Sequence, residues 1–221
     1  MVDVNKLLGQ LLGSGVAGGF AGGLAGGLAS SLLTSKRGRK LGTSVLKLGG
    51  IAAVGALAYA AYQRYSAKQG AGQTALPAPA DHLTAAPTGS AFLPESADDA
   101  ANQQLGLILV RAMIAVARAD GRLDAEESQA IFQKIQGLEL NPEEQSLLVR
   151  EMGQSVDMDT IVNSATTVEI GAEIYTASLL AVEVDSDAER AYLAMLAARL
   201  QLPPGLVQAI EQQVQAQKPA V

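Results

Sequence analysis

Few side chains in this sequence could take part in covalent or metal chemistry. The 221 residues include no Cys and a single His, His82, which lies in a Pro- and Ala-rich stretch. Without Cys the chain has no disulfide, no thiolate metal site and no Cys nucleophile. One imidazole without neighbouring ligands gives no basis for a His-ligated zinc or for a hydrolytic triad. The carboxylates are therefore the main candidates for chemistry.

The carboxylates of interest lie in two short stretches that resemble each other. ARADGRLDAEE spans residues 117–127, and VDSDAERAYL spans residues 184–193. Each follows an apolar run that ends in Asp, and each leads through Ala-Glu to an LxLxP sequence, at 138–142 or 200–204. The repetition indicates two helix–loop–helix units that can pack as a pseudo-symmetric pair.

Capping signals indicate where the helices around these stretches begin. Three residues that favour the N-cap position have Glu three residues later, which is the spacing of a capping box. The pairs are Asp124–Glu127, Asn141–Glu144 and Ser186–Glu189. Together with apolar residues that recur at the helical period, they predict an all-α C-terminal domain, 98–221, of about six or seven helices. We expect these helices near 99–119, 125–136, 142–153, 157–164, 168–184, 187–200 and 204–216.

The two acidic stretches give the chain a resemblance to a known family. ARADGRLDAEE, followed by an apolar helix and then by VDSDAERAYL, resembles the tellurite-resistance TerB-like superfamily. The Gly-rich, basic N-terminal region resembles the YebE-type branch of bacterial inner-membrane proteins. The resemblance covers nearly the whole chain and implies a compact helical domain with a divalent-metal site made of acids. Carried over by position, the implied metal ligands are Asp120, Glu127, Asp185 and Glu189.

Two interpretations of these four acids remain open. Oxygen ligands suit hard cations such as Ca²⁺, Mg²⁺ or Mn²⁺, and clustered carboxylates repel one another unless a cation or protons neutralise them. Alternatively, Glu127 and Glu189 only complete capping boxes and favour the helix dipole. An EF-hand is excluded, because Arg190 and Leu196 stand where the loop that begins at Asp185 would need Gly and Glu. No other cofactor is expected.

The N-terminal region, residues 1–68, has the composition of a membrane anchor. No charged residue occurs from Leu7 to Ser35, and a four-residue repeat (AGGF, AGGL, AGGL, ASSL) runs through 17–32. On a helix near 11–34 the repeat places large apolar residues on one face and two GxxxG series beside it. Such a glycine zipper could pack against another helix in lipid and form homo-oligomers. The alternative is a flexible Gly-rich tether.

A second apolar stretch, 41–62, is long enough to span the core of a bilayer. It follows the basic sequence KRGRK at 36–40 and contains one charged residue, Lys47. Tyr residues cluster at its far end, as they do at membrane interfaces. The alternative is a core helix buried in a soluble domain.

Charge is divided unequally along the chain, whose net charge is −6. Residues 1–68 hold eight Lys/Arg and one acid, whereas residues 69–221 hold eight Lys/Arg and 21 acids. The acidic part argues against a nucleic-acid partner. The basic residues before the 41–62 stretch predict that the C-terminal domain lies on the periplasmic side of a bacterial inner membrane. Residues 69–97, rich in Ala, Pro, Gly and Ser, are expected to form a disordered linker.

Three functions compete at this level. The first is a membrane-anchored, non-enzymatic envelope protein whose acidic helical domain binds a divalent cation or a protein partner, in a stress response. The second is a structural protein that oligomerises through Gly-zipper membrane helices. The third, an enzyme, lacks a visible set of nucleophile, base and orienting group. The first interpretation is preferred, and no enzymatic activity is expected.

Overall fold

The computed structural model describes residues 3–13, 50–70, 85–95, 97–119, 141–154, 157–182, 184 and 186–217. Within these ranges the chain is helical and contains no strand, which confirms the predicted all-α class. The helices are α1 (Val4–Gly13), α3 (Gly50–Gly70), α4 (Asp99–Ala117), α6 (Pro142–Gly153), α7 (Met158–Ser164), α8 (Val168–Ala181), α9 (Asp187–Arg199) and α10 (Pro204–Gln217).

Local capping signals set the helix boundaries in the C-terminal part. Asn141 and Ser186 each form a complete capping box with the Glu three residues later. From α4 to α10, the predicted ranges of the described helices agree with the structure to within three residues at every end. The largest difference among these is at α8, which ends at Ala181 because the backbone of Val182 is extended. The N-terminal helices differ more: α1 ends at Gly13, near the start of the helix expected at 11–34, and α3 continues to Gly70, eight residues beyond the predicted end at 62. The helix expected at 125–136 lies outside the described residues.

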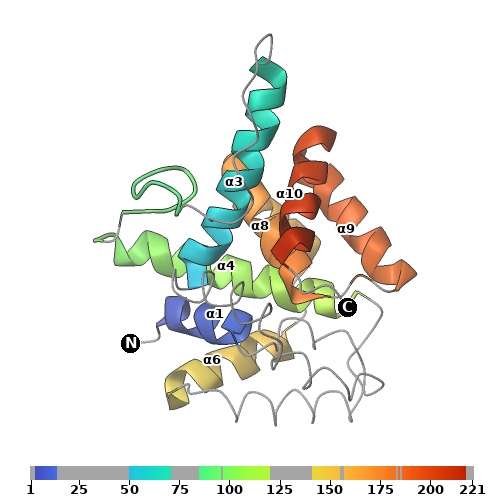
Figure 1. The fold of residues 1–221 in the computed structure, drawn as a ribbon. Helices are drawn as coiled ribbons and strands as arrows, with labels where there is room; N and C mark the ends of the chain where they lie inside the picture. The colour runs from blue at the N-terminus through green and yellow to red at the C-terminus, as the bar shows by residue number, and fades with distance from the viewer. Residues whose placement is uncertain are drawn as a thin grey trace, which may run out of the picture.

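α4 lies at the centre of the arrangement, with helices on both sides of it (Figure 1). α1 and α6 lie on one side, and α8, α3 and α10 lie on the other. α8 makes the most extensive contact with α4, and α3 packs against both α8 and α10. The N-terminal end of α3 also reaches α1. Helices from both ends of the sequence therefore surround the same central pair, α4 and α8.

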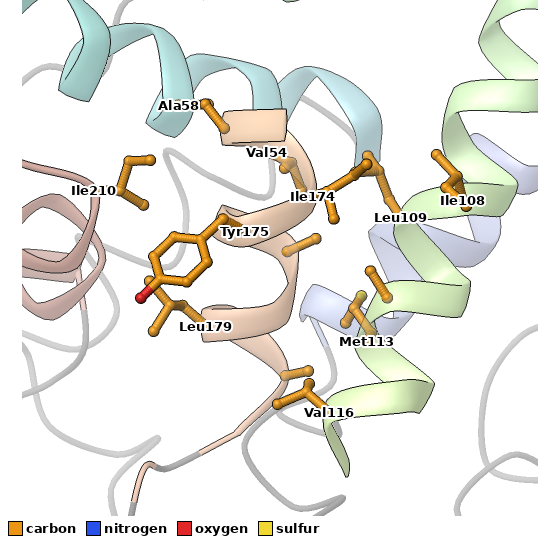
Figure 2. Packing of buried hydrophobic residues seen from close by; sticks show 14 of the residues in the cluster. Val54, Ala58, Ile108, Leu109, Met113, Val116, Ile174, Tyr175, Leu179 and Ile210 are labelled. Carbon is orange, nitrogen blue, oxygen red and sulfur yellow. The ribbon is translucent and has the colours of Figure 1, made fainter. Parts of the chain in front are cut away.

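One hydrophobic cluster joins these helices. Figure 2 shows Val54 and Ala58 of α3 beside Ile174 and Tyr175 of α8, with Ile210 of α10 next to them. Leu7 and Leu8 of α1 are also fully buried in this cluster. The core thus extends across residue 98, where the sequence suggested that the helical domain begins.

α3 contains the described part of the apolar stretch 41–62. Ile51, Val54 and Ala58 on this helix are almost completely buried against the other helices. Gly and Ala make up much of its sequence, so neighbouring helices can approach it closely at the density of a protein interior. Of the two interpretations of this stretch, the burial of its described part favours the core helix. Residues 41–49 lie outside the described residues.

Residues 85–95 belong to the range that was expected to form a linker, yet they contribute to the core. Ala86 and Phe92 are buried. The ring of Phe92 packs edge-on against Tyr59 and Tyr62 of α3, with ring centroids 5.5 and 5.4 Å apart. Aromatic pairs in this geometry add to the free energy gained from burial. This segment therefore packs against α3.

Among the described helices, α4 alone is long and apolar enough to cross a membrane, judged by length and composition. About half of its apolar window, 56%, is buried inside the domain. Its one basic residue within the helix, Arg111, pairs with Glu151 of α6. The central position of α4 accounts for its apolar character, because a helix that is contacted on several sides needs apolar residues on several faces.

Candidate functional site

Glu189 is the one implied metal ligand whose surroundings the structure describes, and it forms a helix cap. Its backbone N–H donates to Ser186 Oγ at 3.1 Å, and its Oε2 accepts from the Ser186 N–H at 3.2 Å. The side chain is buried, with 2% exposure. The predicted capping role of Glu189 is thereby confirmed. Asp120, Glu127 and Asp185 lie outside the described residues.

The metal site itself stays a prediction. In the part of the chain that the structure describes, no three His, Cys, Asp or Glu side chains are grouped so that they could hold a metal ion. The helices that precede the two acidic turns, α4 and α8, lie side by side and run in the same direction, as the labelled residues in Figure 2 show.

Ionic contacts attach α6 to the rest of the fold. Arg111 of α4 donates two hydrogen bonds to the buried Glu151, from Nε to Oε2 at 2.7 Å and from Nη2 to Oε1 at 3.3 Å. Arg118 donates to the carbonyl oxygens of Met152 and Gln154 at the end of α6. A buried carboxylate needs such partners, because desolvation of an unpaired charge costs several kcal/mol. These contacts are therefore structural.

The buried Glu144, at the other end of α6, also has partners. Its Oε2 accepts from the backbone N–H of Asn141 at 2.9 Å and lies 3.7 Å from Lys6 Nζ of α1. The same carboxylate therefore completes a helix cap and links α6 to the N-terminal helix.

Glu173 differs from these acids, because it is buried without a partner. It lies in the middle of α8 with no exposed surface, and neither carboxyl oxygen has a hydrogen-bond partner among the described residues. The other buried polar side chains of α8 bond to their own helix. Thr176 Oγ1 donates to the Ala172 carbonyl at 2.7 Å, and Ser178 Oγ donates to the Ile174 carbonyl at 2.9 Å. Tyr175 reaches Glu211 of α10 through its hydroxyl, so among the buried polar groups of α8 that leave the helix, the carboxyl of Glu173 is the one without a partner among the described residues.

The carboxyl of Glu173 lies against α3 and the 85–95 segment. A Cβ atom on Gly55 of α3 would stand 2.9 Å from Glu173 Oε1 and 2.5 Å from the carbonyl oxygen of Phe92. Both separations are shorter than carbon–oxygen contacts in proteins, so only glycine fits at this position. Glu173, Gly55 and Phe92 therefore mark a junction of three elements, which we call the Glu173 junction.

Burial keeps the carboxyl of Glu173 neutral over a wider pH range than an exposed carboxyl. Desolvation disfavours the charged form and raises the pKa of Glu173 well above 4.5. Burial also raises the pKa of the hydroxyls of the buried Tyr175 and the partly buried Tyr192. The pKa of Tyr192 rises to about 12, and the Glu211 carboxylate adds to the rise in the pKa of Tyr175. Tyr175 donates to Glu211 Oε1 at 3.0 Å.

α1 and α3 touch at their backbones. A Cβ atom on Gly50 would stand 2.6 Å from the backbone nitrogen of Gly9 and would overlap Leu8. The N–H of Ile51 donates to Asn5 Oδ1 at 3.4 Å across the same contact. The first turn of α3 therefore lies against residues 5–9 of α1, although the Gly-rich repeat and the basic cluster separate the two helices in sequence.

No catalytic arrangement was found among the described residues. The cavity between α1, α4 and α6 is lined only by the apolar side chains of Leu11, Val110, Met113, Ile114 and Leu148, and has room for about one water molecule. Catalytic pockets combine apolar walls with convergent polar groups, which this cavity lacks.

Sequence reasoning did not identify Glu173 as a functional candidate. A signal was present, because Glu173 is the only acid in the apolar run IGAEIYTASLLAV at 170–182. An acid in the middle of an otherwise apolar run predicts a buried carboxyl. The sequence could not identify the groups around this carboxyl, because they come from residues about 80 to 120 positions earlier.

Comparisons with known proteins give a family and one relative. A family model described as "Protein of unknown function (DUF533)" matches residues 18–214. The chain is 26% identical over 113 residues to a Yersinia enterocolitica protein described as "Uncharacterized protein in ampR 5'region", across 51% of this chain and 81% of that protein. No solved structure matches. The matched family is TerB-like, which supports that part of the resemblance.

Proposed function

The chain belongs to the DUF533 family of proteins of unknown function, and we propose that it is a non-enzymatic protein attached to one face of a membrane. In this proposal residues 14–49 provide the attachment, and the acidic helical body binds a protein partner or a divalent cation. The observation that carries the proposal is the backbone contact between Gly9 of α1 and Gly50 of α3.

This contact constrains how the N-terminal region can meet a membrane. Because α1 and α3 touch, the segment 14–49 leaves the helical body and returns to it at the same place. It would therefore have to cross a bilayer an even number of times or not at all. Two helical crossings need roughly 40 residues plus a turn, and 14–49 is shorter than that. Attachment to a single face satisfies both constraints.

The composition of 14–49 suits such an attachment. Its first part, up to Ser35, is uncharged and repeats large apolar residues every fourth position, and KRGRK follows at 36–40. Apolar side chains can enter the acyl boundary while basic side chains meet anionic headgroups, each contributing about 1 kcal/mol. The rest of the chain is acidic and would be repelled by the same surface. Attachment would therefore be confined to the N-terminal region.

Vesicle flotation of the full chain tests the attachment. We expect flotation with vesicles that contain phosphatidylglycerol, and weaker flotation with purely zwitterionic vesicles. Exchanging Lys36 and Arg37 for Gln should weaken binding roughly thirtyfold, from about 1 kcal/mol per basic residue. The matched control exchanges Arg64 and Lys68 for Gln, which changes the net charge equally but lies on α3, and should alter binding less than about twofold.

Two results would overturn the attachment. One is that the wild-type chain remains unbound to anionic vesicles. The other is that the Arg64/Lys68 variant loses as much binding as the Lys36/Arg37 variant, which would assign the basic contribution to the helical body.

The second candidate function, assembly through the glycine zipper, is supported by the two GxxxG series within 18–27. Exchanging Gly22 and Gly23 for Leu distinguishes it from the first. If the zipper drives assembly, this variant should lose oligomers in chemical crosslinking of native membranes. If residues 14–49 only attach the protein to the membrane, crosslinking should not change, because added Leu side chains favour insertion into lipid.

A further inference from the structure

Glu173 lies where three elements of the fold meet, and its carboxyl is the polar group at the Glu173 junction that has no partner. α8 supplies the carboxyl, α3 supplies the bare backbone at Gly55, and the 85–95 segment supplies the Phe92 carbonyl oxygen. An acid that is fully buried without a partner costs stability when it is charged, and acids with strongly perturbed pKa values cluster at functional sites. Glu173 is therefore a candidate for a functional role.

No charge on the surrounding elements compensates Glu173, since burial is the one cause of its raised pKa. The charged side chains on these elements that are at least partly buried are Arg64 of α3, Arg111 and Arg118 of α4, and Glu189 of α9. Arg111, Arg118 and Glu189 bond elsewhere, to Glu151, to the end of α6 and to Ser186. Two exposed acids also lie on these elements, Glu95 on the 85–95 segment and Glu211 on α10. The partly buried tyrosines are Tyr59, Tyr62 and Tyr65 of α3 and Tyr192 of α9.

We propose that Glu173 is a proton-operated latch, whose neutral carboxyl holds α3 and the 85–95 segment against α8 and whose ionisation loosens them. A neutral carboxyl can donate a hydrogen bond, so it tolerates the nearby carbonyl oxygen of Phe92. An ionised carboxyl only accepts, so it faces that oxygen with like charge and without water. Opening the Glu173 junction lets water hydrate the ionised carboxyl and so removes this unfavourable desolvation. This inference does not depend on membrane attachment.

The direction of the pH effect follows from proton binding. In the closed state the pKa of Glu173 is raised above 4.5, whereas in an open, hydrated state it returns to about that value. The closed state therefore holds a proton that the open state releases. Its stability is complete below pH 4.5 and declines as the pH rises toward the raised pKa. Between the two values the opening equilibrium increases roughly tenfold per pH unit.

Hydrogen exchange of the full chain in detergent micelles, read by mass spectrometry between pH 5.5 and 8, tests the latch. After correction for intrinsic exchange rates, protection of 85–95 and of the first half of α3 should fall as the pH rises, by up to tenfold per pH unit below the raised pKa of Glu173. In Glu173→Gln, which keeps the shape but cannot ionise, protection should not depend on pH. Glu169→Gln removes a partly exposed carboxylate from the first turn of α8 and should behave as the wild type does.

Gly55→Ala provides a second, independent variant. The added Cβ would press on both Phe92 and Glu173, so it should hold the junction open and keep protection low at every pH. The latch is overturned if wild-type protection is constant across this pH range. It is equally overturned if Glu173→Gln retains the wild-type pH dependence, or if Gly55→Ala remains as protected as the wild type at pH 5.5.

Discussion

At the scale of single residues, the buried acids of this chain fall into two groups. Glu144, Glu151 and Glu189 each accept hydrogen bonds from a backbone N–H or from Arg, which offsets the loss of water. Glu173 has no such partner among the described residues, and burial raises its pKa well above 4.5. The first group fixes helix ends and helix contacts, whereas Glu173 is the buried acid whose raised pKa underlies the proposed pH response.

Replacing Glu189 separates its capping role from its implied metal role. Glu189→Ala removes the acceptor for the Ser186 N–H and should lower the free energy of unfolding by about 1 kcal/mol. Glu189→Gln keeps an oxygen that can complete a capping box, so it should cost less than half as much. Urea denaturation of the two variants at the same pH measures this difference.

A titration with Ca²⁺, Mg²⁺ and Mn²⁺ extends the same comparison to the metal prediction. If Glu189 only caps α9, the melting temperatures of the wild type and of Glu189→Gln should respond equally to the cations. A cation-dependent rise in the wild type that disappears in Glu189→Gln would instead identify Glu189 as a ligand, since binding to the native state stabilises it.

The pair between Arg111 and Glu151 should matter more than an exposed pair. Arg111→Met leaves a buried carboxylate without its main partner, and should lower the free energy of unfolding by roughly 2–3 kcal/mol, less than for a fully buried pair because Arg111 is partly exposed. Adding Glu151→Leu should recover part of that loss. Arg190→Met, which breaks the exposed pair with Asp187, is the control and should cost under about 0.5 kcal/mol. Equal losses in both single variants would contradict this.

At the scale of elements, local signals explain why most helix boundaries could be predicted. Asn141 and Ser186 satisfy the first N–H groups of α6 and α9 from within four residues, so the information is contained in the sequence nearby. The role of α3 could not be read in this way. An apolar helix flanked by basic residues and Tyr is compatible with lipid and with protein, and the choice depends on the faces of α8 and α10 that cover it.

The contact between α1 and α3 depends on Gly50. A Cβ atom at this position would overlap α1, so Gly50→Ala should force the two helices apart and lower the free energy of unfolding by about 1–3 kcal/mol. Gly153→Ala is the matched control, because no atom lies within 4 Å of its added Cβ, and it should be neutral or slightly stabilising. Urea midpoints give both values. A loss at Gly50 no larger than at Gly153 would mean that the helices do not touch there in solution.

At the scale of the whole molecule, the core extends over more of the chain than the predicted domain. A fragment of residues 98–221 would lack α3, and the faces of α8 and α10 that α3 covers would be exposed to water. We expect this fragment to bind a hydrophobic dye and to melt without cooperativity. A fragment of residues 50–221 should melt cooperatively and bind little dye. Cooperative melting of the 98–221 fragment would instead show that a domain beginning at residue 98 folds without α3.

The most direct test asks whether α1, α3 and α10 lie on one side of the membrane. The chain has no Cys, so single Cys residues can be placed at the exposed positions Lys6, Ser66 and Gln212. They are then labelled with a membrane-impermeant maleimide in right-side-out and in inverted vesicles. We expect all three positions to react in the same vesicle preparation and to be protected in the other. Labelling of Lys6 from the side opposite to Ser66 and Gln212 would contradict the attachment to one face and restore a crossing between α1 and α3.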